Sequence, residues 1–443
     1  MRPHRILLVG NGAREHAICD AVLAHNDEIK FYAFMSARNP GIARACEEFA
    51  VGDIHNPADV AKWAAARRIE LAICSPDAVL AAGVSDALWK AGIPTVGPVR
   101  AAARLEWDKA FARELMARHR ITGCPKFKVC RTPAEAAEFI EELGGAVAVK
   151  PAGLTGGKGV KVVGYQLKDA GEAKEYAKEI LAKRIGQLEC VVIEEKLEGE
   201  EFTLQAFVDG KKVVGMPAVQ DHKRAWEGDV GPNTGGMGSY SDAGRTLPFM
   251  RQADYEQGLA IMQHAVDALR KEGIAFQGFL YGQFMLTRGG VCLVEFNSRL
   301  GDPEAMNVLP ILKSDFVELL QQITEGKLGR AEFERKATVC KYLVPAGYPE
   351  NPRKNEPITV MEHAIAQTGA RYYYASVDER DGVIYTSSSR AVALLGIADT
   401  IGKAEEIAER ACSFVKGPLY HRRDIGKAEL IQKRIEHMRV LRG

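Results

Sequence analysis

One predicted β-hairpin in the second half of the chain places oxygen-bearing side chains where they could bind a metal ion. Its strands are residues 280–287 and 291–297, joined by the turn Arg288-Gly289-Gly290. Successive side chains of a strand point to opposite faces, so Glu295 and Asn297 lie on one face. Magnesium prefers hard oxygen ligands and leaves its other positions to waters or phosphates. The hairpin is therefore either a metal-binding face or the polar outer face of an ordinary hairpin.

The register of this hairpin decides whether a third ligand joins the pair. A three-residue loop pairs Thr287 with Val291, and counting outward then places Gln283 opposite Glu295. We therefore predict a patch of one carboxylate and two amides, with Asn297 as the remaining member. A register shifted by one residue would separate Gln283 from the patch but would leave the other two side chains together.

Charged side chains follow the hairpin directly. Arg299 and Asp302 come shortly after its second strand. A positive charge beside a metal-bound phosphate can stabilise the charge that develops during phosphoryl or acyl transfer. The alternative is a surface salt bridge.

Three glycine-rich segments are suited to ligands that carry phosphate. Gly153–Gly159 lies between two predicted strands and lacks the features of a Walker loop, but its backbone N–H groups could bind phosphate beside Lys150. Gly10–Glu15 lacks the third glycine of a dinucleotide fingerprint, yet a helix N-terminus there would suit any phosphate, with Arg14 as a partner. The polar segment Gln220–Ser239 reads as a long loop whose glycines allow close approach to a ligand. The alternatives are a flexible hairpin, plain strand-to-helix packing and a disordered surface loop.

Alternating strands and helices in the N-terminal part of the chain must position the first of these loops. Strands are predicted at 6–9, 30–35 and 71–74, with helices between them. This order predicts a parallel sheet with helices on both faces, as in a Rossmann-like domain. Ligands of such sheets bind at the loops that follow the strands. These loops are Gly10–Glu15, Asn39–Gly41 and Ser75–Ala78.

The pattern of elements changes twice along the rest of the chain. From about residue 105, a helix at Lys109–His119 is followed by strands and helices around the glycine-rich segments, and the hairpin closes this part. After about residue 336 a smaller α+β pattern begins. We therefore predict an α/β and α+β protein of three domains, at residues 1–104, 105–335 and 336–443.

Composition limits the class of protein. The chain has 443 residues, of which 47% are hydrophobic and 26% charged, as expected for a folded protein of several domains. A net charge of +1 argues against a nucleic-acid binder that relies on bulk positive charge. We see no apolar run near the roughly 20 residues of a membrane helix, and the one at the N-terminus is too short for a signal peptide. The nine scattered cysteines indicate free thiols. We expect a cytoplasmic protein.

Seven segments share residues with one known family. The two longest are Gly231–Gly238 and Glu295–Glu304, and a chance match to both, in order and at this separation, is improbable. The others are Gly10–Ala17, Asp108–Phe111, Gly156–Val160, Gln220–Arg224 and His421–Gly426. Over essentially the whole chain, the sequence resembles the phosphoribosylamine–glycine ligases of the ATP-grasp superfamily.

The resemblance implies an ATP-dependent carbon–nitrogen ligase of purine biosynthesis. ATP would phosphorylate the carboxylate of glycine, the amine of 5-phosphoribosylamine would attack the glycyl phosphate, and glycinamide ribonucleotide, ADP and phosphate would leave. The central domain would be an ATP-grasp domain with a lid at about residues 124–192, and the C-terminal domain a small α+β unit. Mg²⁺ or Mn²⁺ would be the cofactor and ATP a co-substrate. The partners would be small molecules, without nucleic acid or membrane, and the chain a monomer or small homo-oligomer.

The resemblance also implies roles for individual residues by motif position. Arg299 and Asp221 would orient glycine and the acyl phosphate, and the metal ligands would be Gln283, Glu295 and Asn297. Glu194 and the backbone near Leu197 would face the adenine, and Glu201 the ribose. The ATP-binding set is Lys109, Lys150, Gly156, Gly157, Lys158, Glu194, Leu197 and Glu201. The substrate-binding set is Gly12, Arg14, Glu15, Asn39, Gly41, Pro76, Asp77 and Asp302.

Departures from the family pattern cluster near the predicted phosphoribosyl pocket and lid. They are Ala13, Asn39-Pro40-Gly41, Trp107-Asp108, Pro151-Ala152 and Ser388-Ser389-Arg390. Three alternatives stay open: another ATP-grasp carboxylate–amine ligase, a nicotinamide-dependent oxidoreductase built on the first glycine loop, and a nucleotide-sensing module without catalytic activity. The second alternative needs an acidic residue for the ribose at the end of the second strand, and Met35–Arg38 holds none.

Overall fold

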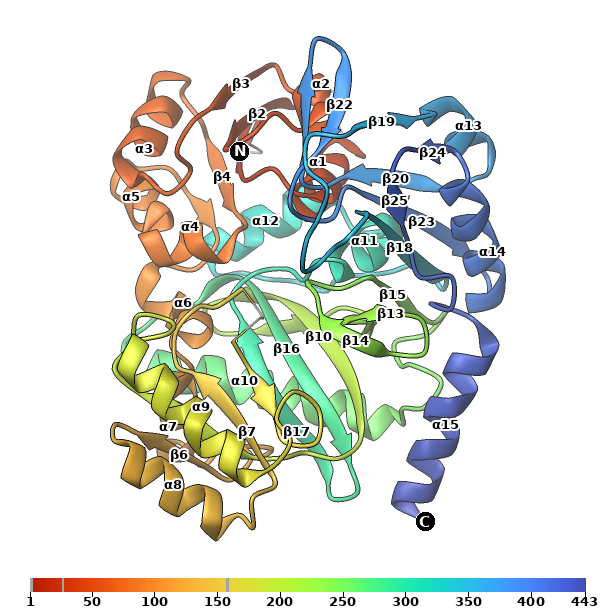
Figure 1. The fold of residues 1–443 in the computed structure, drawn as a ribbon. Coiled ribbons are helices and arrows are strands. Elements are labelled where there is room, and N and C mark those ends of the chain that lie inside the picture. The colour runs from red at the N-terminus through yellow and green to blue at the C-terminus, as the bar shows by residue number, and fades with distance from the viewer. Residues whose placement is uncertain (1–2, 26–27, 157–158) are drawn as a thin grey trace.

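The computed structural model describes residues 3–25, 28–156 and 159–443. They form an N-terminal parallel sheet, a central region with a lid of two helices over a small sheet, and a C-terminal α+β region (Figure 1). The predicted fold class is therefore confirmed. Within these residues, no helix combines the length and the apolar character that crossing a membrane requires.

The N-terminal sheet has the strand order β3-β2-β1-β4-β5, with parallel pairs throughout. The side chains of β1 alternate between two cores: Ile6 and Leu8 pack with α1, whereas Leu7 and Val9 pack with α3 and α5. Apolar residues on both faces are what a doubly covered parallel sheet requires. The elements are β1 (Arg5–Val9), α1 (Ala13–Leu23), β2 (Lys30–Met35), α2 (Pro40–Ala45), β3 (Glu48–Val51), α3 (Pro57–Ala66), β4 (Leu71–Cys74), α4 (Asp77–Ala82), α5 (Val84–Lys90), β5 (Thr95–Val96) and α6 (Arg100–Trp107).

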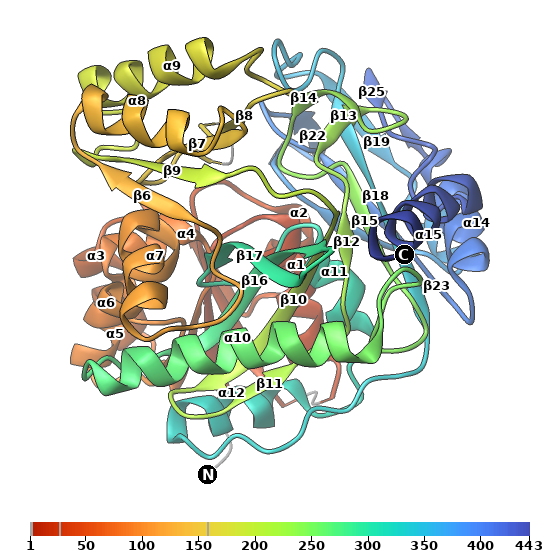
Figure 2. The same cartoon turned by 90° about the horizontal axis from the view of Figure 1, so that it is seen from below.

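The lid is a separate antiparallel sheet with the order β6-β9-β7-β8. Two helices, α8 and α9, lie side by side over it and away from the central sheet (Figure 2). Phe139, Tyr176 and Ile193 belong to a core that is confined to the lid. Strand β8 is short, because Val163 forms only an isolated bridge with Leu167 and a turn lies between these two residues. The elements are β6 (Phe127–Cys130), α8 (Pro133–Glu142), β7 (Val147–Pro151), β8 (Lys161–Val162), α9 (Ala170–Lys183) and β9 (Val191–Glu195).

The central sheet has the order β11-β10-β16-β17 and carries the predicted hairpin as β16 and β17. Helix α10 runs across this sheet (Figure 2) and buries Ile261, Met262 and Leu269 against it. Its buried residues recur every three or four positions, as in an amphipathic helix. The elements are α7 (Lys109–Arg118), β10 (Glu200–Asp209), β11 (Val213–Gly215), α10 (Gln252–Lys271), β16 (Gln277–Thr287), β17 (Gly290–Asn297), α11 (Glu304–Val308), η1 (Leu309–Ile311) and α12 (Phe316–Glu325).

The turn of this hairpin is shorter than predicted. Thr287 pairs with Gly290 and not with Val291, so the turn consists of Arg288 and Gly289 alone. Gly290 has a φ of +118°, which its missing side chain permits. The predicted pairing at the turn was therefore wrong by one residue.

A β-bulge corrects the register before the polar face is reached. Phe284 pairs with Leu293, but the next residue, Gln283, pairs with Glu295, so that Val294 is the extra residue of the bulge. The two deviations cancel, and Gln283 faces Glu295 as predicted.

The polar segment 220–239 is not a simple loop, as the sequence had suggested. It contains β12 (Gln220–Asp221), β13 (Arg224–Trp226), β14 (Val230–Asn233) and the start of β15 (Gly238–Ser241). Strand β15 pairs with β18 of the C-terminal region, in a sheet ordered β12-β15-β18-β23-β20. Within the segment, β12 pairs with β15 and β13 with β14. The pairing of β15 with β18 could not be predicted, because β18 lies about a hundred residues further along the chain. This region also contains β18 (Ala337–Pro345), β20 (Arg371–Tyr374), β23 (Val392–Ala398) and β25 (Leu419–Tyr420).

The C-terminal region ends in a helix that returns to the central sheet. Arg434 of α15 lies 2.9 Å from Glu200, and Arg442 lies 2.7 Å from Asp254. The nine cysteines are free thiols, as predicted. The remaining elements are β19 (Pro357–Val360), α13 (Glu362–Gln367), β21 (Val377–Arg380), β22 (Val383–Thr386), α14 (Ile401–Cys412), β24 (Val415–Lys416) and α15 (Ala428–Arg442).

Candidate active site

The predicted metal face is formed, but its amides are already hydrogen-bonded. Gln283 Oε1 accepts a hydrogen bond from Lys223 Nζ, and Gln283 Nε2 donates to Glu201 Oε2 at 2.8 Å. Asn297 Oδ1 accepts from Arg299 Nη2 at 3.2 Å. The structure places Gln283 opposite Glu295, as predicted, and brings Glu201 and Lys223 to Gln283 and Arg299 to Asn297.

Glu295 is the carboxylate of this face, and it stays charged. Burial disfavours its charged form, but Lys223, Lys109 and Lys150 outweigh burial and lower the pKa of this carboxyl. Among the described residues, no group of three or more His, Cys, Asp and Glu side chains could hold a metal ion. A divalent ion here would depend on one carboxylate, on amide oxygens and on phosphate oxygens, and this donor set fits magnesium.

Glu194 lies between two cations at the junction of lid and body. Arg113 of α7 bonds both of its carboxylate oxygens, at 2.7 and 2.9 Å, and Lys150 Nζ lies 2.7 Å away. Burial penalises this charge, but Arg113 and Lys150 outweigh the penalty and lower the pKa of Glu194 to about 2. The side chain of Glu194 is thus bound within the protein, and its backbone is paired in the lid sheet between β6 and β7.

The bulge of the hairpin belongs to the same junction. The carbonyl oxygen of Val294 accepts from Lys150 Nζ at 3.0 Å and from Arg113 Nη2 at 2.8 Å. The carbonyl oxygen of the neighbouring residue Leu293 also accepts from Arg113 Nη2, at 3.0 Å. Backbone carbonyls at the bulge therefore hold Lys150, a predicted ATP-binding residue, and Arg113, which was not predicted.

The first lysine of the predicted ATP set touches the glycine-rich loop. Lys109 Nζ donates to the carbonyl of Gly153 at 3.3 Å, and its backbone N–H donates to Ala152 O at 2.8 Å. Gly156 has a φ of +59° and open space around it. Leu197 is half-buried in the segment between β9 and β10. The predicted residues Gly157 and Lys158 lie outside the described residues.

Arg299 is held by a buried carboxylate that the sequence analysis missed. Its Nη2 lies 3.0 Å from Oε1 of Glu106, whose Oε2 accepts from the backbone N–H of Ser298 at 2.8 Å. Burial raises the pKa of Glu106 to about 7, against the opposing charge of Arg299. Glu106 directly precedes Trp107-Asp108, where the sequence departs from the family, and this could have drawn attention to it. The sequence gives no sign, however, that Glu106 pairs with Arg299, because the two residues are far apart along the chain.

Asp221 has a carboxylate oxygen for which the described residues provide no partner. This oxygen, Oδ1, is buried and makes no hydrogen bond to any of them. Burial and the nearby charge of Glu304 raise the pKa of Asp221 well above its ordinary value, although Lys223 and Arg390 oppose this. An unpartnered buried oxygen is costly, and a ligand that donates a hydrogen bond would remove the cost.

Two of the N-terminal loops do reach the segment after the hairpin. Arg14 Nη1 donates to the carbonyl of Leu300 at 3.1 Å, and Arg14 Nε donates to Glu15 at 2.7 Å. Glu15 in turn accepts from the N–H of Gly12 at 2.6 Å, and a Cβ at Gly12 would lie 3.9 Å from Asp302. Four predicted substrate residues are thus brought together.

The loop after β4 lies against the same segment. Pro76 is the residue before α4, and its ring packs against the backbone of Gly10. The charge of Asp77 acts on both Glu106 and Arg299, which places this carboxylate close to them.

Asn39 and Gly41 have structural roles that account for their identity. The amide nitrogen of Asn39 donates to Asn11 O at 2.9 Å and to Tyr374 O at 2.8 Å, and its oxygen caps α2. A Cβ at Gly41 would lie 1.9 Å from the His16 ring, so no larger residue fits. The side chain of Asn39 joins the N-terminal and C-terminal regions and is not free for a ligand.

Three family models together match most of the chain. They are the N domain of phosphoribosylglycinamide synthetase at residues 4–106, its ATP-grasp (A) domain at 107–305 and its C domain at 338–428. The chain belongs to the phosphoribosylglycinamide synthetase family.

Similar sequences of this family extend over the full chain. A phosphoribosylamine–glycine ligase of Methanosarcina barkeri is 55% identical over 99% of this chain and 100% of that protein. One from Pyrococcus horikoshii is 49% identical over 99% of this chain and 98% of that protein.

Solved structures agree with this membership. The crystal structure of a phosphoribosylamine–glycine ligase from Thermotoga maritima has a TM-score of 0.81 and 28% identity, over 95% of this chain and all of that one. A biotin carboxylase domain from Hydrogenobacter thermophilus, solved with MgADP and bicarbonate, shares the fold at 15% identity, with a TM-score of 0.70 over 99% of this chain and 94% of that one. Membership of a ligase family leaves the nicotinamide-dependent alternative without support.

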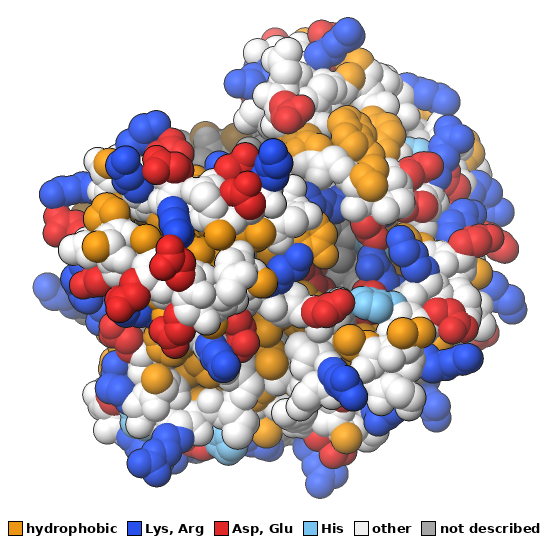
Figure 3. Space-filling view, turned by 60° about the horizontal axis from the view of Figure 1, so that its bottom comes forward, with side chains coloured by type: hydrophobic (Ala, Val, Ile, Leu, Met, Phe, Trp, Pro, Cys, Tyr) orange, Lys and Arg blue, Asp and Glu red, His pale blue; other side chains and the backbone are white. Residues whose placement is uncertain are grey.

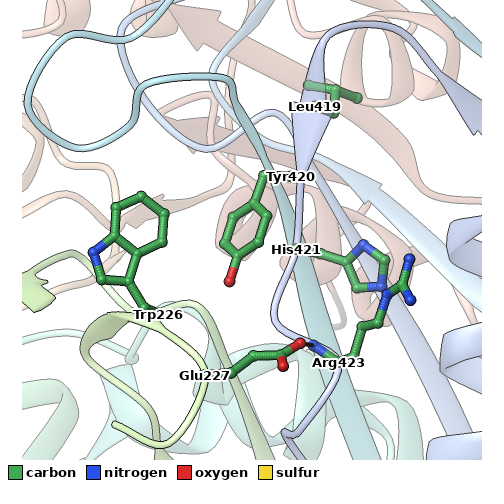
Figure 4. Close-up of a pocket in the computed structure, with 6 residues that line it drawn as sticks. All are labelled: Trp226, Glu227, Leu419, Tyr420, His421 and Arg423. Atoms are coloured by element: carbon green, nitrogen blue, oxygen red, sulfur yellow. Dashed lines mark hydrogen bonds between the residues drawn. The ribbon is translucent and has the colours of Figure 1, made fainter. Parts of the chain in front are cut away.

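In this member of the phosphoribosylglycinamide synthetase family, two pockets lie apart from the predicted site residues. One, of about 580 Å³, is lined by Trp226, Glu227, Leu419, Tyr420, His421 and Arg423 (Figure 4). The other, of about 420 Å³, lies between α7 and α8. Neither contains a predicted site residue. The space-filling view shows instead a hollow between two lobes, with Lys and Arg side chains on its walls (Figure 3).

Proposed function

We propose that this protein joins glycine to 5-phosphoribosylamine at the expense of ATP, in purine biosynthesis. The observation that carries the proposal is the 55% identity to a phosphoribosylamine–glycine ligase over the whole chain. ATP would phosphorylate the glycine carboxylate, since a carboxylate is a poor electrophile. The amine would then displace phosphate from the glycyl phosphate, giving glycinamide ribonucleotide, ADP and phosphate.

The cationic residues of the site support a role in ATP binding. Lys109 and Lys150 lie beside the glycine-rich loop and the lid, where they would contact the phosphates with the backbone of 156–158. The adenine would meet the backbone at Glu194 and Leu197, and the ribose Glu201. Because Lys150 and Arg113 are fixed by the carbonyl of Val294, their charges are positioned before ATP arrives.

Glu295 and Asn297 would hold a divalent ion, Mg²⁺ or Mn²⁺, with Gln283 once Lys223 has released it. Such an ion would neutralise charge on the phosphates and polarise them for transfer. Lys223 and Arg299 already place positive charge on both sides of this face.

Asp221 and Arg299 would position glycine. The unpartnered oxygen of Asp221 suits the ammonium group of the amino acid, and Arg299 suits the carboxylate or the acyl phosphate. Holding both ends of glycine would align its carboxylate with the phosphoryl donor.

The N-terminal loops would bind the phosphoribosyl group. Gly12, Arg14, Glu15, Pro76 and Asp77 lie beside the segment that carries Arg299 and Asp302, and the backbone at Asn39–Gly41 would complete the wall. We no longer assign a ligand to the side chain of Asn39.

Dependence of phosphate release on both substrates tests this function. We expect release only when ATP, glycine and phosphoribosylamine are all present, and we expect glycinamide ribonucleotide as product. Release with another amine in place of phosphoribosylamine would instead favour a different carboxylate–amine ligase of the ATP-grasp superfamily.

We also propose a cytoplasmic location, consistent with nine free thiols, and a monomer or small homo-oligomer. The proposed domain boundaries stay at 1–104, 105–335 and 336–443, with the lid at about 124–192.

A further inference from the structure

Arg390 belongs to the C-terminal region, yet its side chain reaches into the central site. Its Nη1 donates to three backbone carbonyls: Gly235 at 2.7 Å, Gly236 at 3.1 Å and Asp302 at 3.0 Å. Its Nη2 lies 3.1 Å from the Asp302 carboxylate. Each of these contacts joins Arg390 of the C-terminal region to the central region. The partners are the segment at Gly235 and Gly236, which lies against Asp221, and Asp302, which follows Arg299.

Tyr342 binds the same aspartate, and we call Arg390 and Tyr342 together the clamp. Its hydroxyl donates to Asp302 Oδ1 at 2.5 Å, and the guanidinium of Arg390 lies 4.3 Å from its ring centre. The backbone N–H of Tyr342 donates to Met237 O at 3.0 Å. Tyr342 is fully buried on β18, next to β15 (Figure 1), so the clamp stands on the shared sheet and not on a mobile surface.

The backbone that Arg390 holds forms one wall of the Asp221 site. A Cβ at Gly236 would lie 2.7 Å from Asp221 Oδ1 and 2.7 Å from Pro303. Gly236 also has a φ of +107°, so its carbonyl points where an ordinary residue would rarely direct it. If the bonds from Arg390 were lost, this carbonyl and the wall would be free to move, and the unpartnered oxygen of Asp221 would lose its fixed surroundings.

We propose that Arg390 and Tyr342 are positioning residues for ligation, which hold Gly235, Gly236 and Asp302 so that Asp221 keeps a fixed geometry toward the amino-acid substrate. This inference rests on the proposed function for its kinetic consequences only. The clamp joins three carbonyls, one carboxylate and one aromatic ring, which a lysine cannot reproduce because it lacks the planar fork of arginine.

The kinetic test compares Arg390→Lys and Tyr342→Phe with Arg380→Lys. Arg380 is a matched control in the same region: its guanidinium lies 4.1 Å from the ring centre of Tyr385 and 3.1 Å from Asp378, but it is half-exposed. We expect the KM for glycine to rise about tenfold or more in Arg390→Lys and less in Tyr342→Phe, as loss of charge-assisted bonds predicts. The KM for ATP should change less than about twofold, because the ATP-binding residues are held by other contacts. Arg380→Lys should behave as wild type.

Hydrogen exchange supplies a second readout that needs no substrate. The amides of 234–238 should exchange faster in Arg390→Lys and unchanged in Arg380→Lys. The proposal would be overturned if Arg390→Lys kept both the hydrogen-exchange rates and the kinetic constants of the wild type. It would also be overturned if the activity lost in Arg390→Lys were fully accounted for by a smaller fraction of folded protein. A wild-type enzyme that fails to use glycine would contradict the proposed function, while the exchange data would still test the clamp.

Discussion

Buried charges determine what single residues do in this site. Glu194, Glu106, Glu295 and Asp221 are carboxylates of similar chemistry, yet the pKa is lowered at Glu194 and Glu295 and raised at Glu106 and Asp221. Burial favours the protonated form of all four. Nearby cations outweigh burial at Glu194 and Glu295, but not at Glu106 and Asp221, where the charge of another carboxylate adds to the effect of burial. The surroundings of each carboxylate, and not its residue type, therefore determine whether it stays charged or can take up a proton.

Glu295 and Asn297 give the sharpest prediction at this scale. We expect Glu295→Gln and Asn297→Ala each to lower turnover by about 10²-fold or more, because each removes an oxygen ligand or charge from the proposed metal face. Circular dichroism and thermal unfolding should stay close to wild type. The exposed lid residue Glu138, changed to Gln, serves as control. Wild-type activity in either variant at ordinary magnesium would refute the assignment.

Glu106 predicts a pH-dependent stability. Its pKa of about 7 in the folded protein exceeds the ordinary value of 4.5, so the folded state binds the proton more tightly than the unfolded chain. This group therefore lowers stability as pH rises through about 7, by ~2 kcal/mol between about pH 5.5 and 8.5. Glu106→Gln should remove that part of the loss, as measured by urea unfolding at both pH values. Parallel curves for variant and wild type would show that Glu106 does not titrate in this range.

Residue types and spacing pointed to Glu295, Asn297 and Arg299, and the family resemblance pointed to Asp221; the roles of all four stay predictions. Glu106 and Arg390 were not found, because their roles depend on partners that are distant in sequence and become neighbours only in the folded chain.

At the scale of elements, the junction of lid and body depends on one ion cluster and one bulge. Strands β7 and β9 bring Lys150 and Glu194 to Arg113 of α7, and the carbonyl of Val294 accepts from both cations. The runs of Val and Ile in β7 and β9 are typical of buried strands. The bulge could not be predicted from the sequence, since nothing in the alternation of the hairpin marks the extra residue.

Removal of the central anion tests this junction. Glu194→Gln leaves two buried cations without compensation, so we expect a loss of about 3–5 kcal/mol of apparent stability and a higher KM for ATP. Amides of β7 and β9 should exchange faster with solvent. Glu141→Gln is the control, because Glu141 forms an exposed pair with Lys174 in the same lid, and such pairs contribute little. Equal stability of Glu194→Gln and wild type would contradict this account.

At the scale of the whole molecule, the central and C-terminal regions share one sheet. Segment 220–241 enters the sheet of β18 and β23, and Asn307 of α11 donates to Thr338 at 2.9 Å across the same boundary. Strands β1, β2 and β4 of the N-terminal sheet were predictable, because each is followed by its own helix, whereas β3 was not predicted. The shared sheet was not predictable, because the paired strands β15 and β18 lie about a hundred residues apart in the sequence.

This sharing predicts cooperative opening. The amides of β15 and β18 should exchange with solvent at a common opening free energy, distinct from that of the lid strands. Native-state hydrogen exchange at low denaturant would measure it. Val339→Ala, which removes buried volume on β18, should accelerate exchange in both strands and leave β7 and β9 unchanged. Acceleration confined to β18 would show that the two strands open independently.

The shared sheet also limits how this chain could recombine with relatives. In a chimeric protein joined near residue 336, β15 would come from one parent and β18 from the other. The four residue pairs from Gly238–Lys341 to Ser241–Thr338 would then combine residues that did not evolve together. Functional hybrids should therefore tolerate exchange of the lid, which has its own core, far better than exchange of the C-terminal region. A viable graft of that region would have to carry segment 220–241 with it.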